Sequence, residues 1–503
     1  MPYSDLRHFI QDLRKKELLV DVTTPISMDL ELTEIHTRLL DTQGPAILVH
    51  KAQTVAQTQA SMPVLTNMFG TRERIALAMG RECETLRQFG AELAQLRQPS
   101  VPKSLKDAAD AIPMAKRALA MRPKTVKHAP AHEIVLQGDD VDLDQLPIQK
   151  CWPGEPAPLI TWPLVITNGP HPDKEPSDNT NLGIYRMQVT GRNTALLRWL
   201  KHRGGAQHAR KWQNSGNSKL PVAVAIGANP ATILAAVTPI PDNLSEYQFA
   251  GLLRNARCEI TPARTVPIMV PACAEIVLEG TVDLADQAEE GPYGDHTGYY
   301  NVVELFPKMT VHAITMRKDP IYLTTFTGRP PDEPSVLGEA LNELFIPLLQ
   351  QQFPEITDFW LPPEGCSYRI GVVAINKAYP GHAKRIMMGI WSFLRQFMYT
   401  KWIIVVDHTI NIRDWKDVMW AISTKMDPVR DITTMENTPI DYLDFASPHP
   451  SLGSKIGLDA TDKIPPETSR DWGEEISMHQ DIIDIVDKKW SELHLPGGGK
   501  SIW

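Results

Sequence analysis

The stretch Asn181-Leu182-Gly183-Ile184-Tyr185-Arg186 brings an amide side chain, a glycine and an arginine close together in the sequence. Asn181 offers a carbonyl oxygen and the distant Glu246 offers a carboxylate. Both are oxygen ligands of the kind that Mg²⁺ or Mn²⁺ prefers when it bridges a protein to a phosphate. Two ligands leave the coordination shell incomplete, so phosphate oxygens and water would have to complete it. The pair therefore predicts a metal ion that holds a phosphorylated cofactor.

Two carboxylates, Glu290 and Asp295, flank the turn sequence Gly291-Pro292-Tyr293-Gly294. Such a turn folds the chain back, so both carboxylates can converge on one space with Arg186. Burial and like-charge repulsion would then raise the pKa of one carboxyl and leave a proton donor, while Arg186 would keep the other ionised. Taken singly, each carboxylate is more often a solvated surface charge, so their joint arrangement carries the hypothesis.

A second basic segment, Arg198-Trp199-Leu200-Lys201-His202-Arg203-Gly204-Gly205, follows Arg186 closely. Its paired glycines allow the backbone to approach a ligand, which suits a cofactor site. The alternative is a strand with an exposed basic edge. The residues alone leave both interpretations open.

Several segments together resemble one protein family. They look like the UbiD family of prenylated-flavin decarboxylases, and the resemblance runs from the first helix to about Lys463. Two further segments, 198–205 and 362–366, are similar to the form in the bacterial 3-polyprenyl-4-hydroxybenzoate decarboxylase subfamily of ubiquinone biosynthesis. The segments that carry the family resemblance are Asn181–Arg186, Ala274–Gly280, Glu290–Tyr300, Thr327–Pro334 and Glu436–Tyr442.

The resemblance implies a site for prenylated FMN and for a divalent metal ion, Mn²⁺ or Mg²⁺, with K⁺ as a further candidate ion. It implies that Asn181 and Glu246 bind the divalent metal on the flavin phosphate. It also implies two segments that contact the cofactor. Their residues are Ile184, Tyr185 and Arg186, and Arg198, Trp199, Leu200, Arg203 and Gly204.

The resemblance further implies that Asp295 is the catalytic proton donor, with Glu290 and Arg186 as its partners. Relatives of the ferulic-acid type carry Glu at the position of Asp295, so the shorter side chain here must sit closer to the reacting carbon. Those relatives also place a histidine metal ligand where this chain has Gly204. His202 is an alternative ligand, although we prefer a shell of Asn181, Glu246, phosphate and water.

Length and pattern predict an α/β (α+β) protein of several domains. Residues 1–122 are expected to form a mixed N-terminal α/β region, and 123–330 a β-rich, split-barrel-like flavin-binding domain. From 331 to 460 helices and strands alternate, as in an α/β domain, which in the family mediates oligomerisation. Residues 461–503 are expected to form a C-terminal helix and tail.

Individual elements are expected from local pattern. Ser4 should cap the first helix, whose buried stripe is Leu6, Phe9, Ile10 and Leu13. Strands are expected at Leu159–Thr167 and Ala274–Leu278, among others, and a helix at Glu339–Gln351.

Composition limits the class of protein. A net charge of −9 argues against nonspecific nucleic-acid binding. Five scattered cysteines without a Cys-x-x-Cys motif favour a reducing compartment and argue against a zinc site. The most apolar region, Val222–Ile240, is interrupted by prolines and does not read as a membrane span, and no signal peptide is visible. We therefore expect a cytoplasmic protein, with at most peripheral contact with the inner membrane.

The activity that the resemblance implies is non-oxidative decarboxylation of 3-polyprenyl-4-hydroxybenzoate to 2-polyprenylphenol. No ordinary side chain can delocalise the aryl carbanion that this reaction would leave, so an organic cofactor must carry the step. Cycloaddition and a quinoid species remain open as routes to the covalent cofactor adduct.

Two other functions stay in view: a decarboxylase for another aromatic or acrylic acid, and a flavin-binding protein without decarboxylase activity. A pure binding protein would need none of Arg186, Glu290 and Asp295, which weakens the second. The implied partners are a flavin prenyltransferase that supplies the cofactor, other ubiquinone-biosynthesis enzymes, and further copies of the chain in a homo-oligomer, a hexamer by resemblance.

Overall fold

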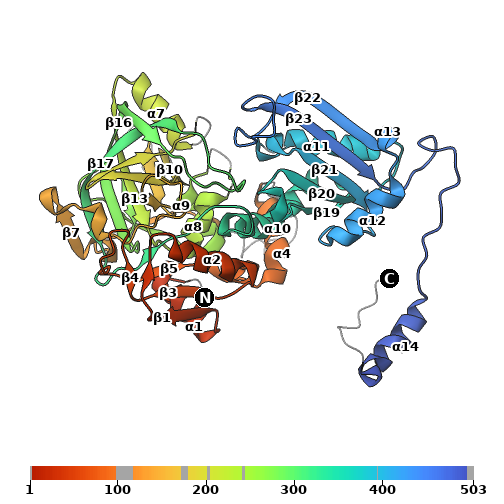
Figure 1. Ribbon diagram of the computed structural model, residues 1–503, viewed down its shortest axis with the longest axis horizontal. Helices are drawn as coiled ribbons and strands as arrows, with labels where there is room; N and C mark the ends of the chain where they lie inside the picture. Colours follow the sequence, from red (N-terminus) through yellow and green to blue (C-terminus); the bar gives the residue numbers. More distant parts are fainter. Residues whose placement is uncertain are drawn as a thin grey trace, which may run out of the picture.

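The middle region of the chain forms a curled antiparallel sheet of nine strands, which lies on the left in Figure 1. The computed structural model describes residues 3–97, 117–170, 179–200, 204–238, 240, 244–393 and 395–494. The strand order is β10-β9-β13-β16-β17-β12-β11-β8, with β7 paired to β17. The strands are β7 Ile134–Gln137, β8 Leu159–Ile160, β9 Leu164–Asn168, β10 Thr180–Ile184, β11 Met187–Gly191, β12 Thr194–Leu197, β13 Lys219–Ile226, β16 Ile276–Glu290 and β17 Glu304–Met316.

The long hairpin of β16 and β17 gives the sheet its curl. Register shifts occur in β16 between Glu279 and Gly280 and between Asp283 and Gln287, and such bulges bend a strand and increase its twist. At Gly280 a Cβ atom would lie 2.0 Å from the carbonyl oxygen of Thr310, so this close approach requires glycine. Glu290, the last residue of β16, meets Arg186 between β10 and β11 and Arg198 directly after β12.

Three helices pack beside β10: α7 Gly204–Asn214, α8 Pro230–Val237 and α9 Glu246–Arg254. A reciprocal capping box fixes the start of α9, because the Ser245 hydroxyl accepts from Gln248 N and the Gln248 side chain accepts from Ser245 N. Glu246 is consequently the first residue of α9 and faces β10.

The N-terminal region forms a four-stranded sheet, β1-β3-β5-β18, in which β18 comes from the far end of the central region. Its first helix buries Leu6, Phe9, Ile10 and Leu13, which confirms the expected stripe. The expected cap at Ser4 is wrong by one residue, because the Asp5 carboxylate accepts from the backbone N–H of His8. The elements are α1 Leu6–Lys15, β1 Leu19–Val22, β2 Ile26–Ser27, α2 Glu31–Asp41, β3 Ala46–Val49, β4 Ala52–Gln53, β5 Val64–Thr66, α3 Arg72–Ala78, α4 Leu86–Arg97 and β18 Tyr322–Leu323.

The C-terminal α/β region is a five-stranded sheet, β19-β20-β21-β23-β22, between two layers of helices. Strands β20, β21 and β23 are parallel, and the two edge strands are antiparallel to their neighbours. Helix α11 packs on one face and α12 on the other. The elements are β19 Ile356–Trp360, β20 Ile370–Ile375, α11 His382–Phe393, β21 Trp402–Asp407, α12 Trp415–Lys425, α13 Pro428–Asp431, β22 Ile432–Pro439 and β23 Leu452–Ala460.

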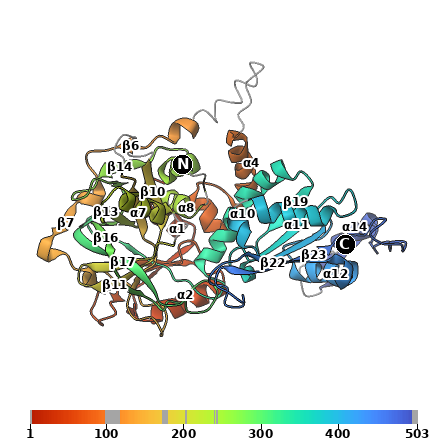
Figure 2. The same cartoon turned by 90° about the horizontal axis from the view of Figure 1, so that it is seen from above.

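Helix α10, Glu333–Gln352, joins the two halves of the molecule (Figure 2). Its first part contributes Leu337, Leu341 and Leu344 to the core that the central and N-terminal regions share. Its last part contributes Ile346 and Leu349 to the core of the C-terminal α/β region. The expected helix at Glu339–Gln351 lies inside this longer one.

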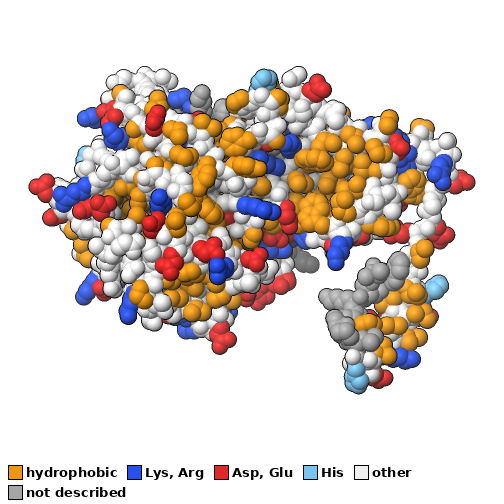
Figure 3. All heavy atoms as spheres, in the orientation of Figure 1, with side chains coloured by type: hydrophobic (Ala, Val, Ile, Leu, Met, Phe, Trp, Pro, Cys, Tyr) orange, Lys and Arg blue, Asp and Glu red, His pale blue; other side chains and the backbone are white. Residues whose placement is uncertain are grey.

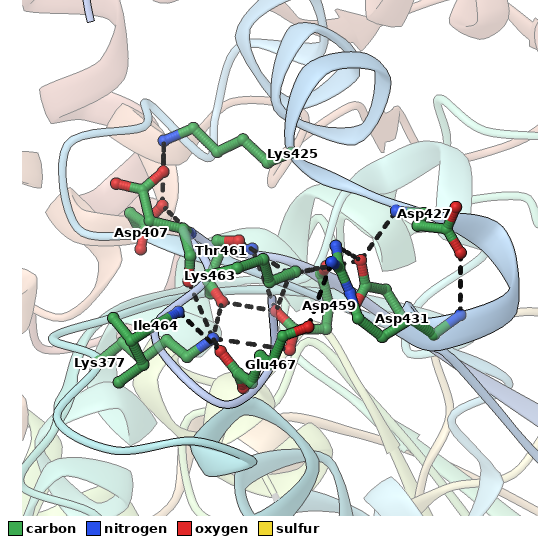
Figure 4. Close-up of polar contacts among 12 residues, drawn as sticks. Lys377, Asp407, Lys425, Asp427, Asp431, Asp459, Thr461, Lys463, Ile464 and Glu467 are labelled. Atoms are coloured by element: carbon green, nitrogen blue, oxygen red, sulfur yellow. Dashed lines mark hydrogen bonds and ion pairs between the residues drawn. The ribbon is translucent and has the colours of Figure 1, made fainter. Parts of the chain in front are cut away.

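A buried ionic network closes the carboxyl ends of β20, β21 and β23 (Figure 4). Lys463 is fully buried, and its ammonium group donates to the Asp459 carboxylate and to the carbonyls of Asp459 and Thr461. Lys377 donates to Glu467 at 2.6 Å. We call Lys377, Asp431, Asp459, Lys463 and Glu467 the lysine–carboxylate network.

Helix α14, Gln480–Trp490, lies apart from the body of the molecule and buries no residue (Figure 1). Its apolar side chains Ile482, Ile485 and Val486 are exposed (Figure 3). Across the described ranges, no helix has the length and apolarity needed to cross a membrane.

The predicted fold class is confirmed: the protein is mixed α/β with a curled antiparallel half-barrel sheet. Two strand predictions need correction. The expected strand Leu159–Thr167 is divided into β8 and β9 around Pro163, which has no N–H for the ladder. The expected strand Ala274–Leu278 starts later and continues to Glu290, because pairing with β17 extends it through an acidic stretch. The proposed domain boundaries remain a prediction.

Candidate functional site

Arg186 lies between Glu290 and Asp295, as the sequence predicted. Its guanidinium donates from Nε to Glu290 Oε1 at 2.7 Å and from Nη2 to Glu290 Oε2 at 3.2 Å. Its remaining nitrogen, Nη1, donates to Asp295 Oδ2 at 2.9 Å. Glu290 is fully buried, and the side chains of Arg186 and Asp295 are each 13% exposed. One arginine therefore holds both carboxylates, although the turn expected at 291–294 lies instead after Asp295, where Gly298 N donates to the Asp295 carbonyl at 2.8 Å.

Arg198 completes this cluster from the neighbouring strand end. The antiparallel pairing of Met187 with Leu197 places Arg186 beside Arg198, whose backbone N–H donates to the Arg186 carbonyl. The guanidinium of Arg198 donates to Glu290 Oε2 at 2.7 Å and to Glu304 at 3.3 Å. We call Arg186, Arg198, Glu290 and Asp295 the arginine–carboxylate cluster.

The C-terminal α/β region reaches the same cluster through Tyr442. Its hydroxyl accepts a short hydrogen bond from Arg198. Asp441 lies 3.9 Å from Nε2 of His296, and its carboxylate also accepts from the hydroxyl of Tyr368 at 2.8 Å. The candidate site therefore lies between the central sheet and the C-terminal region.

Asp295 is held in its ionised form, which corrects the expectation of a carboxyl with a raised pKa. Burial acts to raise the pKa of Asp295, but a 2.8 Å hydrogen bond with the His296 ring and the charge of Arg186 outweigh it and lower the pKa. Burial likewise opposes the charged form of His296, yet Asp295 raises the net pKa of that imidazole. Asp295 is therefore held as a carboxylate and His296 is favoured as an imidazolium.

Glu155 carries the elevated pKa in this neighbourhood, and the sequence reasoning did not select it. Its carboxylate accepts from Cys151 N at 2.8 Å and from Gly294 N at 3.4 Å, directly behind the turn that carries Asp295. Burial raises the pKa of Glu155 to about 7. Nothing in the local sequence Trp152-Pro153-Gly154-Glu155-Pro156 distinguishes this glutamate from a loop residue. His296 lies inside the segment Glu290–Tyr300, but the sequence assigned it no role.

A second group of predicted residues gathers around the start of α7 and α9. Glu246 Oε2 accepts from Leu182 N at 3.0 Å, which places the carboxylate beside Asn181. A Cβ atom at Gly204 would lie 1.8 Å from Asn181 Oδ1, so glycine allows the Asn181 side chain to lie directly against the start of α7. Asn181, Glu246 and the glycine backbone therefore line one small space at two helix N-termini, where anions are favoured.

The chemistry of this donor set fits a divalent cation bound to a phosphate. No ion pair to Glu246 occurs among the described residues, and burial raises the pKa of its carboxyl to about 7. A cation at this position would relieve the cost of the buried charge. Clusters of three or more His, Cys, Asp or Glu side chains with ligand geometry do not occur within the described ranges. The oxygen set is thus incomplete by itself and suits a metal whose shell is completed by a ligand.

The remaining predicted cofactor contacts connect these two groups. The Tyr185 hydroxyl accepts from Gly205 N at 3.1 Å and from the Asn181 amide at 3.4 Å. The indole Nε1 of Trp199 is buried and has no hydrogen-bond partner among the described residues. Ile184 and Leu200 are half-buried at the ends of the described strand and loop. Arg203 and His202 lie outside the described residues.

Comparison with known families gives matches to three models, which together span most of the chain. The models are described as the N-terminal, Rift-related and C-terminal domains of 3-octaprenyl-4-hydroxybenzoate carboxy-lyase, UbiD. They match residues 10–93, 124–330 and 335–460, respectively.

Similar solved structures cover almost the whole chain. The UbiD-class enzyme HmfF from Pelotomaculum thermopropionicum in complex with FMN is 27% identical, with a TM-score of 0.79 over 96% of this chain and 99% of that one. An evolved dimeric form of HmfF in complex with prenylated FMN is also 27% identical, with a TM-score of 0.77 over 96% and 99%. Vanillic acid decarboxylase from Sedimentibacter hydroxybenzoicus in its closed form is 24% identical and shows a likeness of fold, with a TM-score of 0.81 over 98% and 100%.

Proposed function

Because this chain belongs to the UbiD family of prenylated-FMN-dependent carboxy-lyases, we propose that it decarboxylates 3-polyprenyl-4-hydroxybenzoate to 2-polyprenylphenol in ubiquinone biosynthesis. The observation that carries the proposal is the position of Arg186, shared between Glu290 and Asp295. The guanidinium gives two nitrogens to Glu290 and only one, Nη1, to Asp295. A carboxylate held by a single hydrogen bond can be replaced by the carboxylate of a substrate.

Arg186 binds and orients the substrate carboxylate in this proposal. Glu290 holds Nε and Nη2 of the guanidinium in a fork, so the Nη1 edge that faces Asp295 is the part that exchanges partners. Arg198 neutralises the remaining charge on Glu290, which keeps that carboxylate from competing for the substrate position. The two residues therefore fix the orientation of Arg186.

Asp295 holds and moves the proton. Arg186 and His296 lower its pKa in the arrangement described above. When a substrate carboxylate takes the Nη1 edge of Arg186, Asp295 loses part of that attraction and gains a like charge nearby, and both changes raise its pKa. Asp295 then takes the proton from Nδ1 of the His296 imidazolium, 2.8 Å away, and delivers it to the ring carbon that has lost carbon dioxide, after which the neutral His296 regains a proton from water.

Asn181 and Glu246 would hold a divalent metal, Mn²⁺ or Mg²⁺, against the phosphate of the flavin, with Ile184, Tyr185, Trp199, Leu200, Arg203 and Gly204 around the cofactor. The indole N–H of Trp199, which has no partner among the described residues, and the close packing of Asn181 against Gly204 support this assignment. Prenylated FMN, when bound, supplies the electron sink that loss of carbon dioxide from an aryl acid requires.

The proposal extends to the partners of the enzyme. A flavin prenyltransferase supplies the cofactor, K⁺ is an additional ion of the site, and other ubiquinone-biosynthesis enzymes supply and receive the apolar compounds. The chain forms a homo-oligomer, a hexamer by family resemblance, and contacts the inner membrane peripherally from the cytoplasm. Support for self-association comes from the exposed apolar side chains of α14, none of whose residues is buried in the described part of one chain.

The test is expression of the chain with and without a flavin prenyltransferase, followed by mass analysis of the cofactor and a panel of aryl and acrylic acids. The loaded protein should release carbon dioxide from 3-prenylated 4-hydroxybenzoates, and the unloaded protein should be inactive. Arg186→Lys should raise KM for the acid, because an ammonium group cannot reproduce the fork. Arg192→Lys, an exposed arginine on the nearby hairpin, is the matched control. Preference for another acid in the panel would reassign the substrate, and a loaded but inactive protein would reject the proposal.

A further inference from the structure

The segment that follows Asp295 exposes an unusual run of apolar side chains. Tyr299, Val302 and Leu305 are 66%, 63% and 61% exposed, and Tyr300 and Val303 are 42% and 41% exposed. Phe445 of the C-terminal α/β region is 50% exposed and contacts Tyr299 edge to face, with the ring centroids 6.0 Å apart. We call these six residues the apolar strip.

Hydrogen bonds hold the backbone of the strip in place, so the fold itself keeps these side chains exposed. The Tyr299 carbonyl accepts from Asp295 N at 3.0 Å, and Asn301 N donates to the Tyr293 carbonyl at 2.9 Å. The buried Asn301 side chain accepts from Tyr293 N and donates to the Val302 carbonyl. These bonds tie the strip directly to the turn that carries the catalytic carboxylate.

The strip also borders the arginine–carboxylate cluster. Glu304, between two exposed strip residues, turns toward Arg198, and Phe306 lies under the guanidinium of Arg198 at 5.1 Å. Tyr442, three residues before Phe445, bonds to the same arginine. An apolar surface thus begins within a few residues of the reacting groups on both sides of the boundary between the two regions.

The exposure of apolar side chains does not by itself distinguish the apolar strip from other parts of the surface. On the face shown in Figure 3, apolar side chains also gather over the C-terminal α/β region and over α14. The strip differs from them in its covalent and hydrogen-bonded continuity with Asp295, and apolar side chains cost free energy when they stay in water. A surface at this position fits the apolar part of the substrate better than it fits a second protein.

We infer that Tyr299, Val302, Leu305 and Phe445 form the binding surface for the prenyl tail of the substrate and thereby set the preference for tail length. The inference rests on the proposed function and adds the residues that recognise the part of the substrate remote from the carboxylate. Arg186 selects the acid, and the apolar strip selects a 3-alkenyl chain. Remote binding of this kind positions the ring for the reaction.

The experiment uses the holoenzyme and 4-hydroxybenzoates that carry no 3-substituent, a dimethylallyl, a geranyl or a farnesyl group. In the unmodified protein, kcat/KM should rise on the order of 10-fold with the first isoprene unit and rise further with the second, mainly through KM. The double variant Val302→Ser/Phe445→Ser should reduce the ratio of farnesyl to unsubstituted kcat/KM by on the order of 10-fold or more. Val429→Ser, at a residue that is 94% exposed in the C-terminal region, is the matched control and should keep the ratio.

Binding of 2-farnesylphenol and phenol, followed by calorimetry without turnover, gives a second readout. The double variant should lose most of the difference in affinity between the two phenols. A ratio that the double variant leaves unchanged would overturn the inference. A simultaneous decrease in sedimentation coefficient would then identify the strip as a subunit contact, and loss of binding to anionic vesicles would identify it as a membrane contact. Loaded enzyme that decarboxylates none of the four acids would instead reject the proposed function.

Discussion

Two clusters of buried charge, one in each half of the molecule, differ in how completely they are paired. In the lysine–carboxylate network of the C-terminal region, Lys463 has three acceptors and Lys377 bonds to Glu467, Thr461 and the carbonyl of Asp462 (Figure 4). No side-chain atom of this network is buried without a partner. The four members of the arginine–carboxylate cluster are also paired, but the His296 ring that bonds to Asp295 has a buried Nε2 without a hydrogen bond among the described residues, with Asp441 3.9 Å away.

This difference separates a structural cluster from a chemical one. A network whose donors and acceptors match ties the ends of three strands to the chain that follows them. Buried donors without hydrogen bonds and groups with shifted pKa values cost free energy of folding. A bound ligand that pairs with these groups can recover that free energy. The comparison predicts that mutations in the first will reduce stability and mutations in the second will reduce turnover.

The largest effect is expected for Lys463→Met. This change leaves the buried Asp459 carboxylate without its ammonium partner at 3.0 Å, while Asp431 keeps Arg430, and breaking such a buried pair costs about 3–5 kcal/mol of the free energy of unfolding. Urea unfolding measures the loss, and Lys416→Met on the exposed face of α12 is the control. The turnover number of the folded holoenzyme should stay within about 2-fold, since this network is remote from the reacting groups. A large fall in turnover at unchanged stability would contradict the division between the clusters.

Asp295→Asn should reduce turnover by at least ~10²-fold, because an amide cannot deliver a proton at neutral pH. Cofactor content and carboxylate binding should persist, since Arg186 and the Glu246 region are untouched. Single-turnover kinetics of the loaded protein give the measurement, with the exposed Asp144→Asn as the control. Near-normal decarboxylation would transfer the donor role to Glu290 or water.

Retention of the metal ion should depend on pH through Glu246. Burial raises the pKa of Glu246 to about 7 without a metal, and only the carboxylate form binds a cation. Retention of Mn²⁺ after dialysis should therefore rise ~10-fold per pH unit below pH 7 and level off above it. Glu246→Gln should remove this dependence and lower retention of metal and cofactor by ~10-fold or more. The exposed Glu84→Gln should behave as the unmodified protein, and a pH-independent retention would remove Glu246 from the metal site.

The smallest effect is expected for Tyr442→Phe, which removes one hydrogen bond between the C-terminal region and Arg198. A bond of this kind contributes about 1 kcal/mol, so kcat/KM should fall about 5-fold. Tyr379→Phe, a partly exposed tyrosine of the same region, is the control. Unchanged kinetics in Tyr442→Phe would show that the cluster functions without this contact.

The sequence by itself determined the chemical inventory of the site and the class of fold. Only four residues, Gly-Pro-Tyr-Gly, separate Glu290 from Asp295, so the sequence alone places these two carboxylates close along the chain. The apolar stripe of α1 and the alternation of helices and strands after residue 333 follow from local periodicity. Each of these features depends on neighbours in the chain.

Only the tertiary structure decided the protonation of the site and the residues that complete it. The sequence predicted a raised pKa for one of the carboxyls Glu290 and Asp295 without deciding which, and in the folded chain the ring of His296 and the shared arginine lower the pKa of Asp295. Glu155 and Tyr442 join the cluster from segments far away in the sequence, and no role was expected for Glu155, Glu304 or Tyr442 from the sequence. The physical reason is that burial and the distances between charges set a pKa, and both are properties of the packed chain.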